Sequence, residues 1–250
     1  MEKRVVPESV GTPSVSFLVT GENGLFADPL TRIGGERLSY MIPTYDGLRG
    51  ILDSIYFKPT FRWVVERCRV LNPMVQETKG LLMPRLLKGD SEGKDRALCT
   101  YLSNVAYQVE AHMEWRMDLP EYAKDRWPEK HLNMANRAIK VGGRKDVFIG
   151  KREGCCYGYV TPCEFGEGEG YYDHSGVMQF GLMLHGMTYP DNEHDELIAR
   201  FWLPVMKDGV IEYPHPSECE PGLSRLVKKV PGYKERHRIK YVEEEEAEAL

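Results

Sequence analysis

The chain contains 250 residues, of which 42% are hydrophobic and 28% are charged, and its formal net charge is −5. This apolar content supports a substantial core, which excludes a disordered chain, and six cysteines are too sparse for a small secreted disulfide scaffold. No segment approaches the roughly 20 apolar residues that cross a bilayer, and no signal-peptide pattern opens the chain. We therefore expect a soluble, cytoplasmic globular protein with reduced thiols and no membrane partner.

The negative charge is concentrated at the C-terminus. Residues 243–250 hold five glutamates and no cation, so the rest of the chain is formally neutral. Between Lys124 and Arg152 there are nine basic residues and three acidic ones. The net charge therefore does not exclude a nucleic-acid partner, because a local basic face can bind phosphates.

The first half of the chain alternates strand and helix patterns. Residues 15–20 form a β-prone run, and apolar side chains then recur at helical spacing between an N-cap at Thr44 and a stop at Pro59. The next elements are strands at 61–71 and 105–115, a helix that ends at Gly142 and Gly143, and a strand at 147–149. This β-α-β-β-α-β order predicts the α+β class, with a ferredoxin-like (RRM-like) domain over residues 15–150 after a flexible extension over residues 1–14.

The second half has a different texture, with short strand patterns between glycines and prolines. Three candidate strands lie at 177–184, 197–205 and 210–213, and Asp208-Gly209 between the last two is a strong hairpin signal. We expect a small antiparallel β domain over residues 151–232. Residues 233–250 are interpreted as a disordered charged tail.

A glycine pair in the basic region is the first candidate ligand site. Gly142 and Gly143 allow a close backbone approach, and the neighbouring cations can neutralise phosphates. The alternative is an ordinary helix C-cap with solvated charges. The spacing differs from that of a nucleotide-binding P-loop, so ATP or GTP hydrolysis is unsupported. The candidate contacts to a phosphate backbone are Lys58, Arg137, Lys140, Gly142, Gly143, Arg144 and Lys145.

Two further signals concern proton transfer. In Lys130-His131 the histidine titrates near neutral pH, and the lysine can stabilise a phosphorane or lower the histidine pKa. The alternative is two surface residues in the first turn of a helix. Tyr56 ends the first helix and can face the second, although a half-buried core tyrosine has the same pattern.

A zinc site is a remote third hypothesis. Its ligands would be Cys155, Cys163, His174 and His185, but their gaps do not match the usual C-x(2–4)-C spacing. We therefore expect buried free thiols and no metal or other cofactor.

Several motifs together resemble one protein family. They are Gly24 to Thr31, Ile33 to Tyr40, Ser54 to Pro59, Glu129 to His131, Gly142 to Gly150, and Gly158 to Gly166, in order within residues 17–231. The chain resembles the subtype I-C (Dvulg) branch of the CRISPR-associated Cas family five, a RAMP-type endoribonuclease that processes precursor CRISPR RNA. The resemblance implies a ferredoxin-like N-terminal domain and a catalytic group at Tyr56, Lys130 and His131.

The chemistry expected of such a site uses the 2′-hydroxyl of RNA as the nucleophile, which needs alignment and proton transfer but no metal. The resemblance implies a CRISPR repeat hairpin cut at its base, leaving a 2′,3′-cyclic phosphate and a 5′-hydroxyl. Expected partners are the crRNA, kept by its 5′ handle, and the other subunits of a type I-C surveillance complex; duplex DNA is a further partner to test. The main rival is a non-catalytic subunit that holds the crRNA handle.

Overall fold

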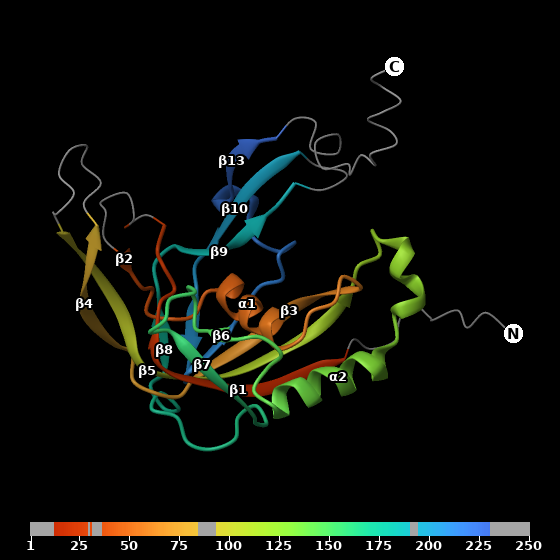
Figure 1. Ribbon diagram of the computed structural model, residues 1–250, viewed down its shortest axis with the longest axis horizontal. Helices are drawn as coiled ribbons and strands as arrows, with labels where there is room; N and C mark the ends of the chain where they lie inside the picture. Colours follow the sequence, from red (N-terminus) through yellow and green to blue (C-terminus); the bar gives the residue numbers. More distant parts are fainter. Residues whose placement is uncertain (1–12, 30, 32–36, 85–93, 191–194, 231–250) are drawn as a thin grey trace, which may run out of the picture.

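The computed structural model describes residues 13–29, 31, 37–84, 94–190 and 195–230. The predicted acidic tail lies outside these residues, as do nearly all of the predicted N-terminal extension and residues 33–36 of one family motif. The described chain is a mixed α/β structure dominated by antiparallel strands (Figure 1).

Most of the strands form one large sheet. Its main path runs β6-β7-β1-β5-β3-β12-β11-β8, and β2 and β4 also pair with β5. The bounds are β1 Ser14–Gly24, β2 Arg37–Leu38, β3 Phe61–Val70, β4 Val75–Pro84, β5 Lys94–Trp115, β6 Val147–Phe148, β7 Tyr157–Pro162, β8 Val177–Gln179, β11 Val205–Lys207 and β12 Val210–Glu212. The long β5 lies between β1 and β3 and also pairs with β4 in an arm that extends to the left in Figure 1.

The apolar face of this sheet explains the strand pattern in β1 and β5. Val15, Phe17 and Val19 alternate with more exposed residues, and Phe17 lies directly opposite Val109 in β5. Because alternate side chains of a strand point to opposite faces, these residues form one buried surface. Burying each such side chain contributes about 1.5–3 kcal/mol.

Two helices cover that apolar surface. Helix α1 (Tyr45–Ile55) begins where Thr44 Oγ1 accepts a hydrogen bond from the Gly47 N–H at 3.2 Å, and it buries the predicted apolar stripe. Helix α2 (Pro128–Lys140) begins with proline at its first position and contacts β1 and β7. No helix of the described residues is long and apolar enough to span a membrane.

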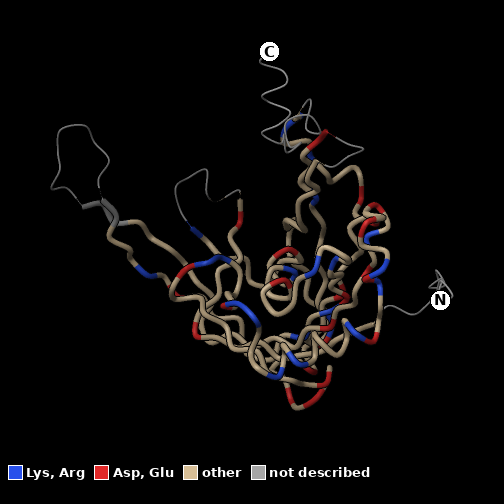
Figure 2. The backbone as a smooth tube through the Cα atoms, turned by 45° about the vertical axis from the view of Figure 1, so that its right-hand side comes forward, with Lys and Arg blue, Asp and Glu red and all other residues tan. Residues whose placement is uncertain are grey.

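The opposite face of the sheet is partly covered by the loop between β7 and β8. Arg69 of β3 donates two hydrogen bonds of 2.7 Å to the Asp173 carboxylate of this loop, and a further one to Gln108 at 3.1 Å. Arg69 is buried, so these charge-assisted bonds fix the loop on the sheet. The loop is acidic, and it forms the lowest part of the molecule in Figure 2.

The C-terminal strands belong to two sheets. Strands β9 (Met183–Thr188), β10 (Glu196–Trp202) and β13 (Arg225–Lys229) form a separate three-stranded sheet, while short 3-10 turns lie at Pro120–Asp125 and Pro221–Leu223. The predicted turn at Asp208-Gly209 is confirmed: β11 pairs with β12, and Asp208 and Gly209 have φ values of 46° and 79°. The first strand of this hairpin is the short β11 and not the predicted strand at 197–205. Because β12 also pairs with β3, this hairpin extends the main sheet. The predicted division into one domain over residues 15–150 and a second over residues 151–232 stays a prediction.

The predicted strands at 177–184 and 197–205 were wrong as single strands, because the first is divided into β8 and β9 and the second into β10 and β11, with the two parts in different sheets. Two further details differ from the sequence prediction. The predicted strand at 147–149 is the two-residue β6, and the neighbour of β1 is instead β7, which the analysis did not identify. The predicted strand at 105–115 is the second half of the longer β5, whose first half pairs with β4. Both differences concern pairing between distant segments, which local periodicity does not report.

Candidate active site

The site is built on the facing ends of the two helices. Helix α1 ends at Tyr56, whose backbone leaves the helical region because Pro59 follows closely. The Tyr56 carbonyl accepts a 2.8 Å hydrogen bond from Trp63 Nε1, which fixes the backbone there. His131 lies in the first turn of α2. The Tyr56 hydroxyl lies 2.8 Å from His131 Nδ1, and both residues are 0% exposed.

The proton positions in this pair follow from the partner of the second ring nitrogen. His131 Nε2 lies 2.7 Å from the backbone carbonyl oxygen of Asp125. A carbonyl only accepts, so Nε2 carries the proton and Nδ1 accepts from the Tyr56 hydroxyl. The sulfur of Met134 lies 3.5 Å from the same hydroxyl. His131 is therefore held as one neutral tautomer.

The surroundings keep both groups neutral. Burial lowers the pKa of His131, and the Asp125 carbonyl and carboxylate oppose this only in part. Burial raises the pKa of Tyr56, although the nearby Arg144 guanidinium lowers it. At neutral pH His131 is consequently a free base and Tyr56 a phenol that can donate its proton.

Asp125 connects the pair to Lys130, and sequence analysis did not identify it. Its carboxylate forms an ion pair with Lys130 Nζ and accepts a 2.7 Å hydrogen bond from the Thr60 hydroxyl. Burial would raise the pKa of Asp125, but the hydrogen bonds from Lys130 and Thr60 and the charge of Lys130 outweigh it and lower the pKa. Asp125 thus orients His131 through its carbonyl and Lys130 through its carboxylate. Its position at the end of the 3-10 turn Pro120–Asp125, shortly before α2 begins at Pro128, was the available signal.

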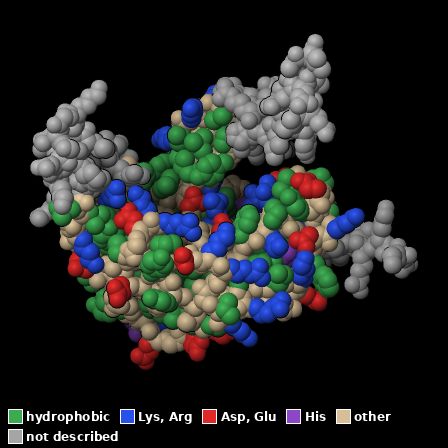
Figure 3. Space-filling model, viewed as in Figure 1, with side chains coloured by type: hydrophobic (Ala, Val, Ile, Leu, Met, Phe, Trp, Pro, Cys, Tyr) green, Lys and Arg blue, Asp and Glu red, His purple; other side chains and the backbone are tan. Residues whose placement is uncertain are grey.

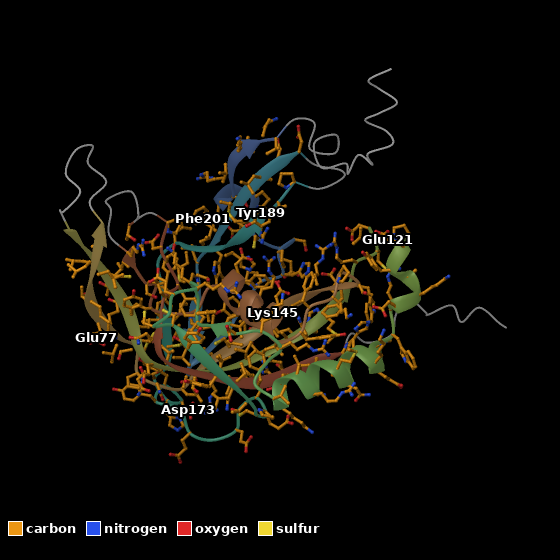
Figure 4. The ribbon with its side chains drawn as sticks, in the orientation of Figure 1. Glu77, Glu121, Lys145, Asp173, Tyr189 and Phe201 are labelled. Carbon is orange, nitrogen blue, oxygen red and sulfur yellow. The ribbon has the colours of Figure 1, made fainter. Side chains whose placement is uncertain are left out.

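Arg144 covers the pair from the solvent side. Its guanidinium carbon lies 4.9 Å from the centre of the Tyr56 ring, a cation–π distance. The backbone N–H groups of Arg144 and Lys145 both donate to the Ser54 carbonyl in α1, at 3.3 and 3.1 Å. The basic loop is therefore attached to the helix that ends in Tyr56. Figure 4 places Lys145 near the centre of the molecule, beside α1 and β6.

The glycine pair ends helix α2. Gly142 and Gly143 have φ values of 83° and 108°, and their N–H groups donate to Ile139 and Ala138 at 3.1 and 2.8 Å. This is a Schellman C-cap, the alternative considered from the sequence. Their N–H groups are bonded within the protein, so a role in RNA binding rests on close approach of the backbone and stays a prediction.

The predicted RNA-binding cations lie around this cap. Arg137, Lys140, Arg144 and Lys145 are exposed, and Lys58 is partly exposed close enough to lower the pKa of His131. In Figure 3 blue side chains gather across the face on which β6, β7 and α2 lie in Figure 1. The acidic loop between β7 and β8 lies below this face, so charge is segregated along the surface.

The residues of the zinc hypothesis do not meet. The structure finds no group of three or more His, Cys, Asp or Glu residues positioned to hold a metal among its described residues. His185 is buried in β9, where its Nε2 lies 3.0 Å from the Pro214 carbonyl, whereas Cys155 is exposed.

The family model described as "CRISPR-associated protein (Cas_Cas5)" matches residues 14–214. The chain belongs to this Cas5 family. The matched range includes both helices, the basic loop and every member of the site described above.

Two curated relatives and a solved structure are similar to this Cas5 chain. The CRISPR pre-crRNA endoribonuclease Cas5d of Thermus thermophilus is 29% identical over 70% of this chain and 73% of its own. The protein of that name from Mannheimia succiniciproducens is 26% identical over 78% of this chain and 92% of its own. A crystal structure of a CRISPR-associated protein has a TM-score of 0.67 and 32% identity, covering 86% of this chain and 97% of its own.

Proposed function

We propose that this Cas5 protein is a metal-independent endoribonuclease that cleaves the repeat RNA of precursor CRISPR transcripts. The observation that carries the proposal is the 2.8 Å contact between the Tyr56 hydroxyl and His131 Nδ1, which joins residues 75 apart in the sequence. Lys130 is held beside this pair through Asp125, and an exposed cluster of cations lies around it. The two curated relatives, named as pre-crRNA endoribonucleases, support the same reaction.

The proposed reaction transfers a proton along the hydrogen bond of the pair. The Tyr56 oxygen accepts the proton of the 2′-hydroxyl while its own proton passes to His131 Nδ1. The 2′-oxygen then attacks the phosphorus, the bond to the 5′-oxygen breaks, and that oxygen takes a proton from water. The hydroxide so formed is neutralised by the proton that His131 returns through Tyr56, which restores the starting state. The products are a 2′,3′-cyclic phosphate and a 5′-hydroxyl.

Charged neighbours stabilise the states formed on this path. The Asp125 carboxylate lies 3.5 Å from His131 Nε2, and its negative charge stabilises the imidazolium that forms when His131 accepts the proton. Lys130 supplies positive charge for the dianionic phosphorane. A raised pKa makes Tyr56 a poor base by itself, so the proton acceptor is His131, reached through the phenol. We therefore propose His131 as the base, a choice that the residue types alone left open.

RNA binding must open the site, since Tyr56 and His131 have no exposed surface. Arg144 is the group to move, because it lies over the Tyr56 ring and its side chain is free to pair with a phosphate. We infer that the scissile region of the RNA draws Arg144 away and takes its place. Lys58, Arg137, Lys140 and Lys145 hold the flanking backbone.

The chain's fold fits this role. The order β7-β1-β5-β3, with α1 and α2 on one face, supports the finer proposal of a ferredoxin-like arrangement in which β7 is the fourth strand. We further infer that the product stays bound by its 5′ handle within a type I-C surveillance complex.

A second function is favoured by one observation. Complete burial of Tyr56 and His131 is also what a structural hydrogen bond between two helices requires. The chain would then hold the crRNA handle in the complex without cutting RNA.

Cleavage of the host repeat RNA separates the two functions. Wild type should cut in excess EDTA, should not cut RNA with a 2′-deoxy substitution at the scissile position, and should retain the product. His131→Ala should slow cleavage by about a hundredfold or more while changing RNA affinity little. A wild-type protein that binds the repeat and leaves it intact supports the handle-binding role.

A further inference from the structure

An exposed aromatic strip lies on β6 and β7. Tyr157 and Tyr159 are 45% and 70% exposed, whereas Val160 between the strand and helix α2 is buried. The alternation places both tyrosines on the face of the sheet that the helices do not cover. The ring of Phe148 in β6 lies 4.6 Å from that of Tyr157, which continues the strip to the sheet edge.

The neighbours of the strip are mostly polar or charged. Tyr159 pairs in register with Thr20 of β1, and the next exposed position of β7, Thr161, pairs with the partly exposed Leu18. Glu22, two residues after Thr20 in β1, is exposed and adds one negative charge to this face. The Arg152 guanidinium carbon lies 5.4 Å from the centre of the Phe148 ring. The nearby Glu153 carboxylate is already engaged, by Arg37 at 3.1 Å and by the Tyr101 hydroxyl at 2.8 Å. Aromatic rings beside the Arg152 cation, with Leu18 as the aliphatic residue in register, favour nucleic-acid bases over an apolar protein surface.

The strip is also continuous with the basic loop of the candidate active site. Strand β6 is separated from Lys145 only by the exposed Asp146, and it pairs with the first two residues of β7. At the other end β7 leads into the acidic loop fixed by Asp173, which repels phosphates. A strand that passes the active site can therefore continue around the β6 edge toward Tyr157 and Tyr159.

We propose that Phe148, Tyr157 and Tyr159 form a stacking platform for unpaired nucleotides that flank the cleaved hairpin of the repeat RNA. The two tyrosines are separated by two residues of an antiparallel strand, roughly 6.8 Å, so each ring can receive a separate base. Arg152 contacts the accompanying phosphates. The inference rests on the proposed function for the identity of the RNA, and it adds a base-binding surface to the phosphate contacts.

The test uses the full chain and a repeat RNA with 2-aminopurine in its unpaired flank. Tyr157→Ala/Tyr159→Ala should weaken binding by at least about tenfold and abolish the fluorescence quenching that stacking causes. The double variant Tyr157→Phe/Tyr159→Phe should keep the wild-type affinity and the fluorescence quenching, because it retains both aromatic rings. Tyr189→Ala is the matched control, since Tyr189 is 62% exposed beside the separate three-stranded sheet (Figure 4).

Further measurements distinguish the proposed base stacking from RNA cleavage. A repeat hairpin without flanks should be bound and cut equally by wild type and by the double alanine variant. Equal affinity of wild type and variant for flanked RNA overturns the platform while wild-type cleavage stands. Normal RNA binding with lost assembly into the surveillance complex overturns it in favour of a protein-docking surface. Failure of wild type to cut refutes the proposed function alone, since the binding comparison needs no cleavage.

Discussion

Replacing Tyr56 by phenylalanine removes one hydroxyl and leaves the ring packing of the site in place. The buried Nδ1 of His131 then loses its donor at 2.8 Å, while Nε2 keeps its bond to the Asp125 carbonyl. An unsatisfied buried acceptor costs about 1–3 kcal/mol. For a chain of this size the melting temperature should fall by about 2–10 °C. The single-turnover cleavage rate should fall by about 10²–10⁴, because the proton path is interrupted.

Tyr213→Phe provides the matched control for this variant. The Tyr213 hydroxyl is also buried and donates at 2.8 Å to the Pro43 carbonyl. The Tyr213→Phe variant should lose about as much free energy of unfolding, measured in urea, as Tyr56→Phe does. It should nevertheless cut RNA at nearly the wild-type rate. If Tyr56→Phe loses stability like Tyr213→Phe but cleaves at the wild-type rate, the Tyr56–His131 bond is structural and the proposed proton path is wrong.

Three further results are expected. The single-turnover rate should rise with pH and level off, with its midpoint below the ordinary histidine value of 6.5, because burial lowers the pKa of His131 and the base must be neutral. A midpoint near pH 9–10 would contradict this. Burial lowers the pKa of His185 to about 4, so its stabilising contribution is complete above its ordinary value of 6.5 and is lost as pH falls toward 4. Between pH 7.5 and pH 4.5, the free energy of unfolding in urea should fall by about 2–3 kcal/mol more for wild type than for His185→Gln. Equal decreases would show that protonation of His185 does not cause the loss of stability. Arg144→Gln should reduce the slope of log affinity against log salt by about 0.7, and an unchanged slope would show that Arg144 contacts no phosphate.

The local elements were predictable because their signals are local. Thr44 and Pro59 bracket α1, the glycine pair at 142–143 ends α2, and Asp208-Gly209 turns between β11 and β12. The strand order was harder to predict. β6 and β7 exchange the expected place beside β1, because the choice depends on pairing across the sheet.

In the candidate active site, too, the local signals were visible in the sequence and the contacts between distant residues were not. Tyr56 and His131 are 75 residues apart, and their residue types gave only weak separate signals; the family resemblance connected them. Asp125 was missed because it acts on His131 through a backbone carbonyl, a contact that no side-chain motif encodes. The burial of the pair, and hence the need for Arg144 to move, depends on packing between the helices and the loop.

The central claim is tested most directly by the chemistry of the cut. Purified wild-type protein would be incubated with end-labelled repeat RNA in excess EDTA, and the product ends would be identified by phosphatase and kinase treatment. The account predicts a single cut that leaves a 2′,3′-cyclic phosphate and a 5′-hydroxyl, with no cut in RNA carrying a 2′-deoxy substitution at that position. Cleavage of the deoxy RNA, or a 5′-phosphate on the product, would contradict attack by the 2′-hydroxyl through Tyr56 and His131.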